Sequence, residues 1–540
     1  MKNIFSLFFP LIFSLCIAAQ APYIEWQKSL GGSNGEVARS IQQTYDGGYI
    51  VAGYSLSNSG DASGLHSGFF WDYWIVKLNS LGAIQWQKML GGTNTDFAYS
   101  IHQTQDSGYI VAGYADSFNG DVTGHHGNSG NPQHDIWIVK LGLIGNIQWQ
   151  KTLGGSSVDI SYDVRQTTDG GYIVAGIPVS TDGDVIGLHG SSSDYWLVKL
   201  DASGNIQWQK SLGGNGADRV MSIGQTFDGG YIMAGLTGSF DGDVTGHNVG
   251  VSSDYWIVKV DTSGSIEWQK CFGGYGADEA RAVQQTTDGG YIVAGISGSN
   301  DGDVTVNLGG EDYWVMKLSS TGILQWQKSL GGIYNDEANS IQQTTDGGYI
   351  VGGWTESDDH DVTGLHHGIG CSGCFTQDYW VVKLDANGNI QWQKALGGEG
   401  SEEAYSVIQS LDGGYVVAGF SESITGDVTG HHGSAGSGYH GEDNASDFWI
   451  VKLGVVSNIN ETESTTAFKI YPNPTTDQLF LETNGTEVQL VNIYNITGAL
   501  VNQATQLQNK NIDVSQLAQG VYIAEIKTKE GSVKRRWVKM

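Results

Sequence analysis

The sequence predicts an all-β chain: a seven-bladed β-propeller closed by its N-terminal strand, followed by a small C-terminal β-sandwich. Three observations lead to this prediction. A unit of about 60 residues recurs seven times, each copy holds four strand-like runs, and the chain begins with a lone strand that precedes the first full unit. A repeat of this period is typical of propellers and solenoids.

Two series of tryptophans mark the repeat. The string Trp-Gln-Lys begins at seven positions, 58 to 66 residues apart, and a second tryptophan stands in a pattern such as Tyr-Trp-Ile-Val-Lys-Leu. The first series is Trp26, Trp86, Trp149, Trp208, Trp268, Trp326 and Trp392, and the second is Trp74, Trp137, Trp196, Trp256, Trp314, Trp380 and Trp449. Repetition therefore explains 14 of the 17 tryptophans.

Four runs in each unit are expected to be strands. In the second unit they are residues 100–104, 109–113, 136–141 and 147–151, the last two rich in β-branched and aromatic residues. Asp-Gly-Gly and Gly-Asn turns join them into antiparallel hairpins. The two central runs are apolar on both alternating faces, which favours sheets packed on both sides. Four-stranded sheets repeated radially make a propeller.

The ends of the array predict how the ring closes. The chain enters with a strand at residues 24–28 and leaves after residues 449–453, with no Trp-Gln-Lys strand following. We therefore expect residues 24–28 to be the fourth strand of the last blade, because closure removes exposed sheet edges. A linear solenoid is the alternative, but it would need atypical capping units.

The units resemble a bacterial β-propeller repeat family. Its copies have a Tyr-Ile-Val-Ala-Gly strand, a variable loop, an Asp-Tyr-Trp-Val-Val-Lys-Leu strand and a Gly-containing turn. The resemblance covers residues 23–455, and we place the propeller domain at residues 20–455. It implies a fold and says little about activity, because propellers host many unrelated functions.

The N-terminus predicts export. Lys2, an apolar segment and the small residues Ala18 and Ala19 make residues 1–19 a secretory signal peptide. Cys16 lacks the small residue expected just ahead of a lipidated cysteine. No later segment reaches the roughly 18 apolar residues that a membrane span needs, so we expect a soluble mature protein.

The tail differs in character from the repeats. Residues 456–467 are a polar linker, and residues 468–540 alternate apolar and polar residues in short runs, which predicts a small β-sandwich. The tail resembles the type A C-terminal sorting domain of the type IX secretion system of Gram-negative bacteria. The residues that carry the resemblance are Tyr471, Pro472, Asn473, Pro474, Gly520, Tyr522, Lys534, Arg535 and Arg536.

This resemblance implies passage across the outer membrane. The partner of residues 468–540 would be the outer-membrane type IX secretion machinery, and the protein would be extracellular or on the outer-membrane surface. An ordinary accessory sandwich is the alternative.

The net charge makes nucleic acid an improbable partner. The chain carries a formal charge of -30, and without residues 468–540 the remainder carries -32. Such a field repels phosphates and favours cations.

Strand parity predicts where a binding site lies. In a four-stranded meander the second connection and the crossover to the next blade share one face, and these hold the long, variable segments. We expect a binding site on this face or at its central mouth, and we expect the face to be acidic. The crossovers supply Glu36, Asp96, Asp159, Asp218, Asp278, Asp336 and Glu402, and the third strands begin with Asp72, Asp135, Asp194, Asp254, Asp312, Asp378 and Asp447.

The long loops add closely spaced aspartates that suit Ca²⁺, because hard cations take carboxylate and carbonyl oxygens. The candidate ligands are Asp182, Asp184, Asp241, Asp243, Asp301, Asp303, Asp359 and Asp361. The alternative is that these side chains cap turns through hydrogen bonds to the backbone. The spacing reproduces no EF-hand loop, which favours the alternative.

Histidines and cysteines recur less regularly. His66, His125, His189, His247, His366 and His431 are expected to share one repeated loop position, which favours a structural role. Cys371 and Cys374 form a single Cys-x-x-Cys, which in an exported protein favours a disulfide over zinc. Cys271 is expected to be a packed free thiol.

No catalytic residues stand out, because the units are nearly uniform and show no Ser-His-Asp arrangement or phosphate loop. We therefore expect a monomeric, secreted or cell-surface propeller for binding or adhesion, with an unknown glycan or protein as ligand. A carbohydrate-active hydrolase or lyase using carboxylates at the mouth is one alternative, and a purely structural surface array is another.

Overall fold

The computed structural model describes two parts of the chain. The first is residues 21–454 without 128–132, 191, 248–251, 367–375 and 433–445; the second is residues 469–539 without 472–474, 476, 483–487, 496–499, 505–510, 518–519 and 530. The predicted signal peptide, Cys16, Cys371 and Cys374 lie outside the described residues. One compact unit holds strands β1 to β28 and the other holds β29 to β35. The described residues contain no helix long and apolar enough to cross a membrane.

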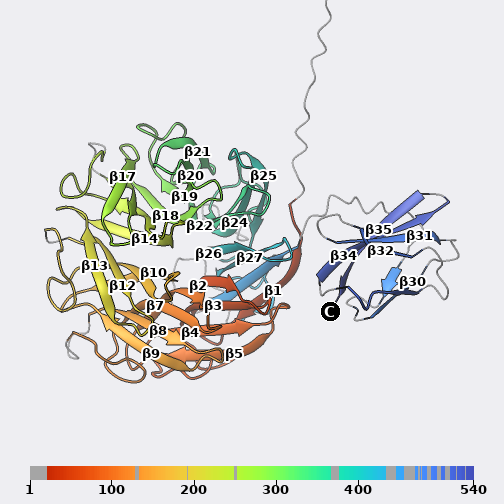
Figure 1. Cartoon of the computed structure of the whole chain (residues 1–540), viewed down its shortest axis with the longest axis horizontal. Coiled ribbons are helices and arrows are strands. Elements are labelled where there is room, and N and C mark those ends of the chain that lie inside the picture. Colours follow the sequence, from red (N-terminus) through yellow and green to blue (C-terminus); the bar gives the residue numbers. More distant parts are fainter. Residues whose placement is uncertain are drawn as a thin grey trace, which may run out of the picture. The chain divides into compact units, whose positions relative to one another are not determined.

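The first unit consists of antiparallel four-stranded sheets arranged around a centre (Figure 1). The prediction of an all-β chain built from repeated four-stranded sheets is confirmed. From innermost to outermost strand, the seven sheets in the described part are β2 (Glu36–Gln43), β3 (Tyr49–Ser55), β4 (Asp72–Leu78) and β5 (Ile84–Leu90); β6 (Asp96–Gln103), β7 (Tyr109–Ala115), β8 (Asp135–Leu141) and β9 (Ile147–Leu153); β10 (Asp159–Gln166), β11 (Tyr172–Pro178), β12 (Tyr195–Leu200) and β13 (Ile206–Leu212); β14 (Asp218–Gln225), β15 (Tyr231–Thr237), β16 (Asp254–Val260) and β17 (Ile266–Phe272); β18 (Asp278–Gln285), β19 (Tyr291–Ser297), β20 (Asp312–Leu318) and β21 (Leu324–Leu330); β22 (Asp336–Gln343), β23 (Tyr349–Thr355), β24 (Asp378–Leu384) and β25 (Ile390–Leu396); β26 (Glu402–Gln409), β27 (Tyr415–Ser421), β28 (Asp447–Leu453) and β1 (Ile24–Leu30).

Strand β1 is the outermost strand of the sheet that contains β28. The two strands are antiparallel, with Gln27 opposite Val451 and Leu30 opposite Phe448. Gln27 Oε1 accepts the indole N–H of Trp449 at 2.8 Å, and Gln87 of β5 accepts that of Trp74 at 2.9 Å. The N-terminal strand therefore takes the same role in this sheet as β5 does in the first.

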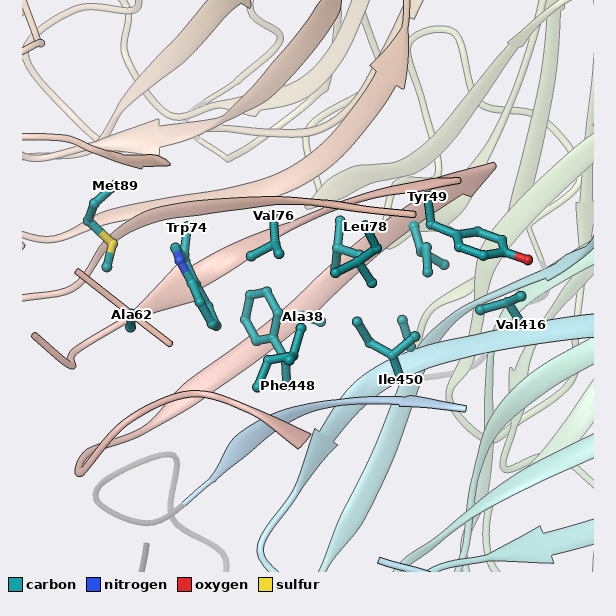
Figure 2. Packing of buried hydrophobic residues seen from close by; sticks show 14 residues of the cluster. Ala38, Tyr49, Ala62, Trp74, Val76, Leu78, Met89, Val416, Phe448 and Ile450 are labelled. Atoms are coloured by element: carbon teal, nitrogen blue, oxygen red, sulfur yellow. The ribbon is translucent and has the colours of Figure 1, made fainter. Parts of the chain in front are cut away.

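The core lies between neighbouring sheets. Figure 2 shows one such layer, in which Trp74 and Val76 of β4 meet Phe448 and Ile450 of β28. The tryptophans of the third strands are fully buried in all seven sheets. Because both faces of the central strands pack against a neighbour, those strands need no polar alternation.

The second unit consists of two sheets that share one core. The sheets are β29 (Lys469–Tyr471), β30 (Gln478–Glu482) and β33 (Asn511–Asp513), and β32 (Leu500–Ala504), β31 (Val488–Asn495), β34 (Gly520–Thr528) and β35 (Gly531–Lys539). Leu479, Ile493 and Trp537 are fully buried in the common core. Two sheets over one core form a small β-sandwich.

Candidate functional site

The innermost strand of each sheet carries a β-bulge at the same place. In β2 the register with β3 shifts between Ala38 and Ser40, so Arg39 is the extra residue. A bulge re-aims a side chain and is frequent next to binding sites. The bulged residues are Arg39, Tyr99, Tyr162, Met221, Arg281, Asn339 and Tyr405.

All seven bulged residues line the centre, where they separate two cavities. The outer cavity, of about 450 Å³, lies where the innermost strands begin, and it is also lined by Glu279, Glu337, Trp354 and Glu403. The inner cavity, of about 500 Å³, extends toward the ends of the same strands. The outer cavity therefore lies at the end of the centre where the crossovers enter, which is the end that strand parity predicts for a binding site.

One half of the outer cavity is aromatic, because blades 2, 3 and 7 contribute Tyr99, Tyr162 and Tyr405 to its wall. Beside Tyr405, the buried Tyr54 stacks on Phe97 with ring centroids 3.8 Å apart, and Trp71 meets both rings edge-on. Tyr99 and Tyr162 lie 5.3 Å apart, between centroids. Aromatic surfaces of this kind supply large contact areas to a ligand.

The opposite half of the rim is acidic. Arg281 lies between two glutamates, with Nη1 2.5 Å from Glu337 Oε2 and Nε 3.6 Å from Glu279 Oε1. Burial raises the pKa of Glu311, and the nearby Glu337 raises it further. Burial also raises the pKa of Glu422 to about 7, with Glu403 adding to the shift. Glu279, Glu337 and Glu403 of blades 5 to 7 therefore line the outer cavity together with Arg281.

The inner cavity contains a polar cluster that is specific to blades 2 and 3. Asp163 Oδ1 accepts a hydrogen bond from Ser100 at 2.9 Å, and its Oδ2 accepts one from Arg165 Nη2 at 3.1 Å. His102 Nε2 lies 3.8 Å from Asp163 Oδ1. Burial lowers the pKa of His102 to about 4, with the Arg165 charge contributing, so the imidazole is neutral at pH 7.

The prediction that the carboxylates of the crossovers and third strands form an acidic surface is wrong. All fourteen, from Glu36 and Asp72 to Glu402 and Asp447, are at most 1% exposed. They lie in pairs between blades, such as Asp96 with Asp72. The reason is that the repeated Gly-Gly of the crossover leaves room for two side chains: a Cβ on Gly91 would lie 2.5 Å from Asp96 Oδ2 and 2.6 Å from Asp72 Oδ1.

The two members of a pair have different partners. Asp96 Oδ2 accepts from Gly92 N at 2.9 Å and from Ser117 Oγ at 2.7 Å. Asp72 Oδ2 accepts from the backbone N–H of His66, whereas its buried Oδ1 has no hydrogen-bond partner. Burial raises the pKa of Asp96 to about 8 and that of Asp72 to about 6, so each pair resists ionisation.

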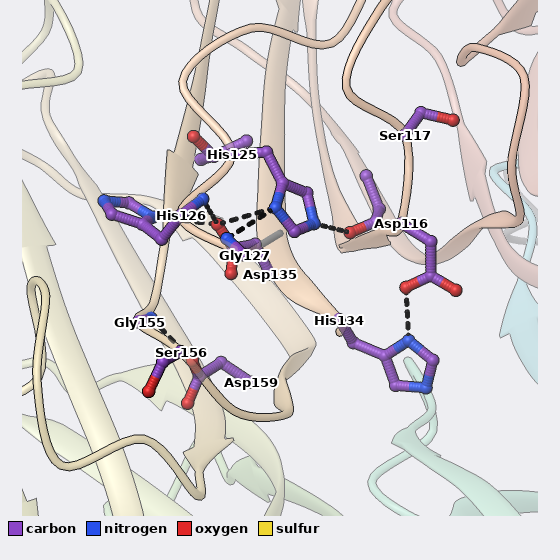
Figure 3. A network of polar contacts seen from close by, with 12 residues as sticks. Asp116, Ser117, His125, His126, Gly127, His134, Asp135, Gly155, Ser156 and Asp159 are labelled. Atoms are coloured by element: carbon purple, nitrogen blue, oxygen red, sulfur yellow. Dashed lines mark hydrogen bonds and ion pairs between the residues drawn. The ribbon is translucent and has the colours of Figure 1, made fainter. Parts of the chain in front are cut away.

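The histidines occupy two adjacent loop positions, so the prediction of one shared position is wrong. His126 Nδ1 lies 2.8 Å from Asp135 Oδ2 (Figure 3). His125 Nε2 instead lies 3.0 Å from the Ala115 carbonyl. The spacing of the repeats does not separate the two positions, because the two residues are neighbours in the chain. His66, His126, His189, His366 and His432 take the first role, and each also lies 3.3 to 4.0 Å from an aspartate of the next blade.

The loop aspartates predicted to bind Ca²⁺ lie in hydrogen-bonded turns. Asp182, Asp241, Asp301 and Asp359 each accept a backbone N–H of the adjoining crossover, at 2.7 to 3.0 Å. Asp184, Asp243, Asp303 and Asp361 each donate their own N–H to a crossover glycine. In the described part of the chain no three His, Cys, Asp or Glu side chains converge as a metal site requires. Calcium binding stays a prediction.

The remaining predicted residues are placed as follows. Cys271 is a free, partly buried thiol, and burial raises its pKa to about 12. Tyr471 is half exposed, whereas Tyr522 is buried and stacks on Trp537, with ring centroids 5.1 Å apart. Lys534 and Arg535 lie on β35, and Pro472, Asn473 and Pro474 lie outside the described residues.

Sequence reasoning missed the ring of bulged residues. The sequence does indicate that this position is unusual, because it varies between Arg, Tyr, Met and Asn while the neighbouring positions repeat. The alternation of apolar and polar residues, however, does not reveal a bulge. The bulge shifts the residue from the blade interface to the centre.

Comparison with known proteins identifies the tail. Residues 469–540 match the family described as "Secretion system C-terminal sorting domain". This confirms the sorting-domain prediction: the protein is exported by type IX secretion to the cell surface or the extracellular space.

The remaining similarities are distant. A segment of 241 residues is 26% identical to the Regulatory protein FlaEY of Caulobacter vibrioides, covering 42% of this chain and 24% of that protein. The chain thus spans about a quarter of the length of this curated relative.

The chain is also similar, at low identity, to several solved structures. BamB from Moraxella catarrhalis is 12% identical with a TM-score of 0.34, covering 96% of this chain and 99% of that one. YCF48 bound to D1 peptide is 9% identical with a TM-score of 0.39, covering 82% and 99%. Puromycin hydrolase is 11% identical with a TM-score of 0.42, covering 94% and 62%. At these TM-scores the assignment of repeated blades rests on the strand pairing of this chain.

Proposed function

Because residues 469–540 carry the sorting domain of type IX export, we propose that the chain is a secreted or cell-surface binding protein of adhesion type. Its ligand binds in the outer cavity. The observation that carries this proposal is the position of the seven bulged residues: a strand position that varies between Arg, Tyr, Met and Asn from sheet to sheet lines one shared cavity. Variation at a cavity wall, beside strands that otherwise repeat, supports recognition of a ligand there.

The proposal includes a closed ring of seven blades. The N-terminal strand lies in the last blade, where Gln27 accepts the indole N–H of Trp449. Two contacts join the last blade to the first: the shared core of Trp74 and Phe448, and His432 Nε2 3.5 Å from Asp61 Oδ2. A closed ring holds the seven bulges rigid, so the ligand meets a preorganised site.

We propose binding without catalysis. The carboxylates of the acidic half pair with Arg281 or with one another, which suits recognition of a charged group. A carbohydrate-active enzyme remains the competing proposal, and incubation of the full chain with bacterial and plant polysaccharides tests it. Release of reducing ends that Glu337→Gln abolishes would favour the enzyme.

The binding proposal is tested with the full mature chain on a printed glycan array and a synthetic peptide array. Tyr99→Ala and Tyr405→Ala should each remove most of any captured signal, because both side chains line the outer cavity. Phe227→Ala is the matched control, since this exposed aromatic residue lines only the inner cavity. Signals unchanged in both outer-cavity variants would contradict the proposed site.

A second prediction concerns the export of the protein. Removal of residues 468–540 should leave the protein in the periplasm, because the sorting domain is lost while the blades end at Leu453. Cell fractionation measures this, and circular dichroism of the truncated protein shows whether the blades still fold. Delivery of the truncated chain to the cell surface at the wild-type level would contradict it.

A further inference from the structure

The outer cavity already holds two arginine side chains of its own, and the first lies in the aromatic half. The Arg39 guanidinium lies over the Tyr405 ring, 3.8 Å from its centroid, and within 5.6 Å of the centroids of Tyr54 and Tyr99. Its Nη2 donates to the Tyr54 hydroxyl at 2.8 Å. Stacked aromatic faces of this kind attract cations.

The second arginine lies in the acidic half, where carboxylates outnumber it. The side chains of Glu279, Arg281 and Glu337 are 24%, 20% and 17% exposed, so a ligand can reach all three. Glu403 accepts a hydrogen bond from the Tyr405 hydroxyl at 2.5 Å and thereby joins the two halves. The outer cavity is therefore lined by three glutamates and two arginines, Arg39 included, which leaves one carboxylate in excess.

Resting on the proposed function, we infer that the ligand is a basic peptide segment that inserts one arginine or lysine side chain into the outer cavity. The apolar stem of that side chain lies along the tyrosines and its charged head lies among the glutamates. The two resident arginines show that both halves accept such a group. A neutral sugar would leave the excess carboxylate without a cationic partner, which costs binding energy.

The test compares two synthetic peptide libraries that differ at one position. One library has a fixed central arginine and the other has citrulline, which keeps the shape but has no charge, and both are labelled for fluorescence anisotropy with the full mature chain. The arginine library should bind about tenfold more tightly or better, as expected for a charged hydrogen-bonded group. Equal binding of the two libraries would overturn the inference, and this comparison needs no variant protein.

Two variants locate the effect. Glu279→Gln and Glu403→Gln together should abolish the preference for arginine over citrulline, whereas Glu399→Gln, an exposed glutamate of a crossover, should preserve it. A preference that survives the double variant would also overturn the inference.

The inference and the proposed function can fail separately. Capture of a saccharide that depends on Tyr99 and Tyr405, without a difference between the peptide libraries, would overturn the inference and leave the proposed function standing. If no captured ligand depends on Tyr99 or Tyr405, both are wrong.

Discussion

The protein should be most stable near pH 4 to 5 and should lose several kcal/mol of its free energy of unfolding as the pH rises to 9. The cause is the set of buried carboxylate pairs between blades. Burial raises the pKa of Asp96 to about 8, and that of Glu36, Asp336 and Glu402 to about 7. A carboxyl group with a raised pKa in the folded state gives stability that is present below its unfolded pKa and lost as pH rises through its folded pKa.

The size of this effect follows from the number of pairs. One pKa unit corresponds to about 1.4 kcal/mol, so even one unit per interface gives several kcal/mol in total. At the acid end the sign reverses for the turn aspartates: hydrogen bonds and the Lys199 charge lower the pKa of Asp169 to about 2, and its contribution is lost as pH falls below 4. Urea unfolding at pH 5, 7 and 9 measures the whole profile.

A single substitution tests whether the buried carboxylate pairs cause this pH dependence of stability. Asp72→Asn should stabilise the chain at pH 9 and reduce its pH dependence, because the amide can donate to Asp96 from the place of the unpartnered Oδ1. The groups that face this pair are His66 and Asp121. Asp312→Asn is the matched variant at an interface where Leu308 stands in place of this histidine and donates its backbone N–H to Asp312 Oδ2. Equal stability of the wild type at pH 5 and 9 would contradict the prediction.

Deletion of residues 21–30 should be the most damaging truncation of the first unit. It removes β1, exposes the edge of β28 and takes Leu30 from the core that Trp74 and Phe448 share. We expect a loss of at least about 5 kcal/mol in the free energy of unfolding, the range of severe core damage. Denaturant unfolding of the soluble fraction measures it, and wild-type stability of the truncated chain would contradict it.

A matched pair of substitutions tests the same point without truncation. Gln27→Ala and Gln87→Ala each leave one buried tryptophan N–H without its acceptor, so each should cost about 1 kcal/mol. Equal costs indicate that β1 and β5 play the same part in their sheets. A cost for Gln87→Ala alone would argue against the role of β1.

Only the position of the candidate site could be predicted from the sequence. Strand parity placed it at the end of the centre where the crossovers enter, because parity depends only on the number of strands in each unit. The residues themselves could not be predicted, since Arg39 and its equivalents follow from a one-residue bulge that alternation does not encode. The same applies to His125 and His126, whose roles depend on which neighbour reaches Asp135.

The sequence by itself determined the repeated four-stranded sheets, the pairing of residues 24–28 with residues 449–453, and the sorting domain, because each depends on local pattern and repeat period. Only the tertiary structure decided what the acidic residues do. Glu36 and Asp447 lie about 400 residues apart in the chain, yet a Cβ on Gly31 would lie 2.3 Å from an oxygen of each. A count of charges cannot distinguish a surface carboxylate from one buried between blades, because that difference is made by the packing of neighbouring sheets.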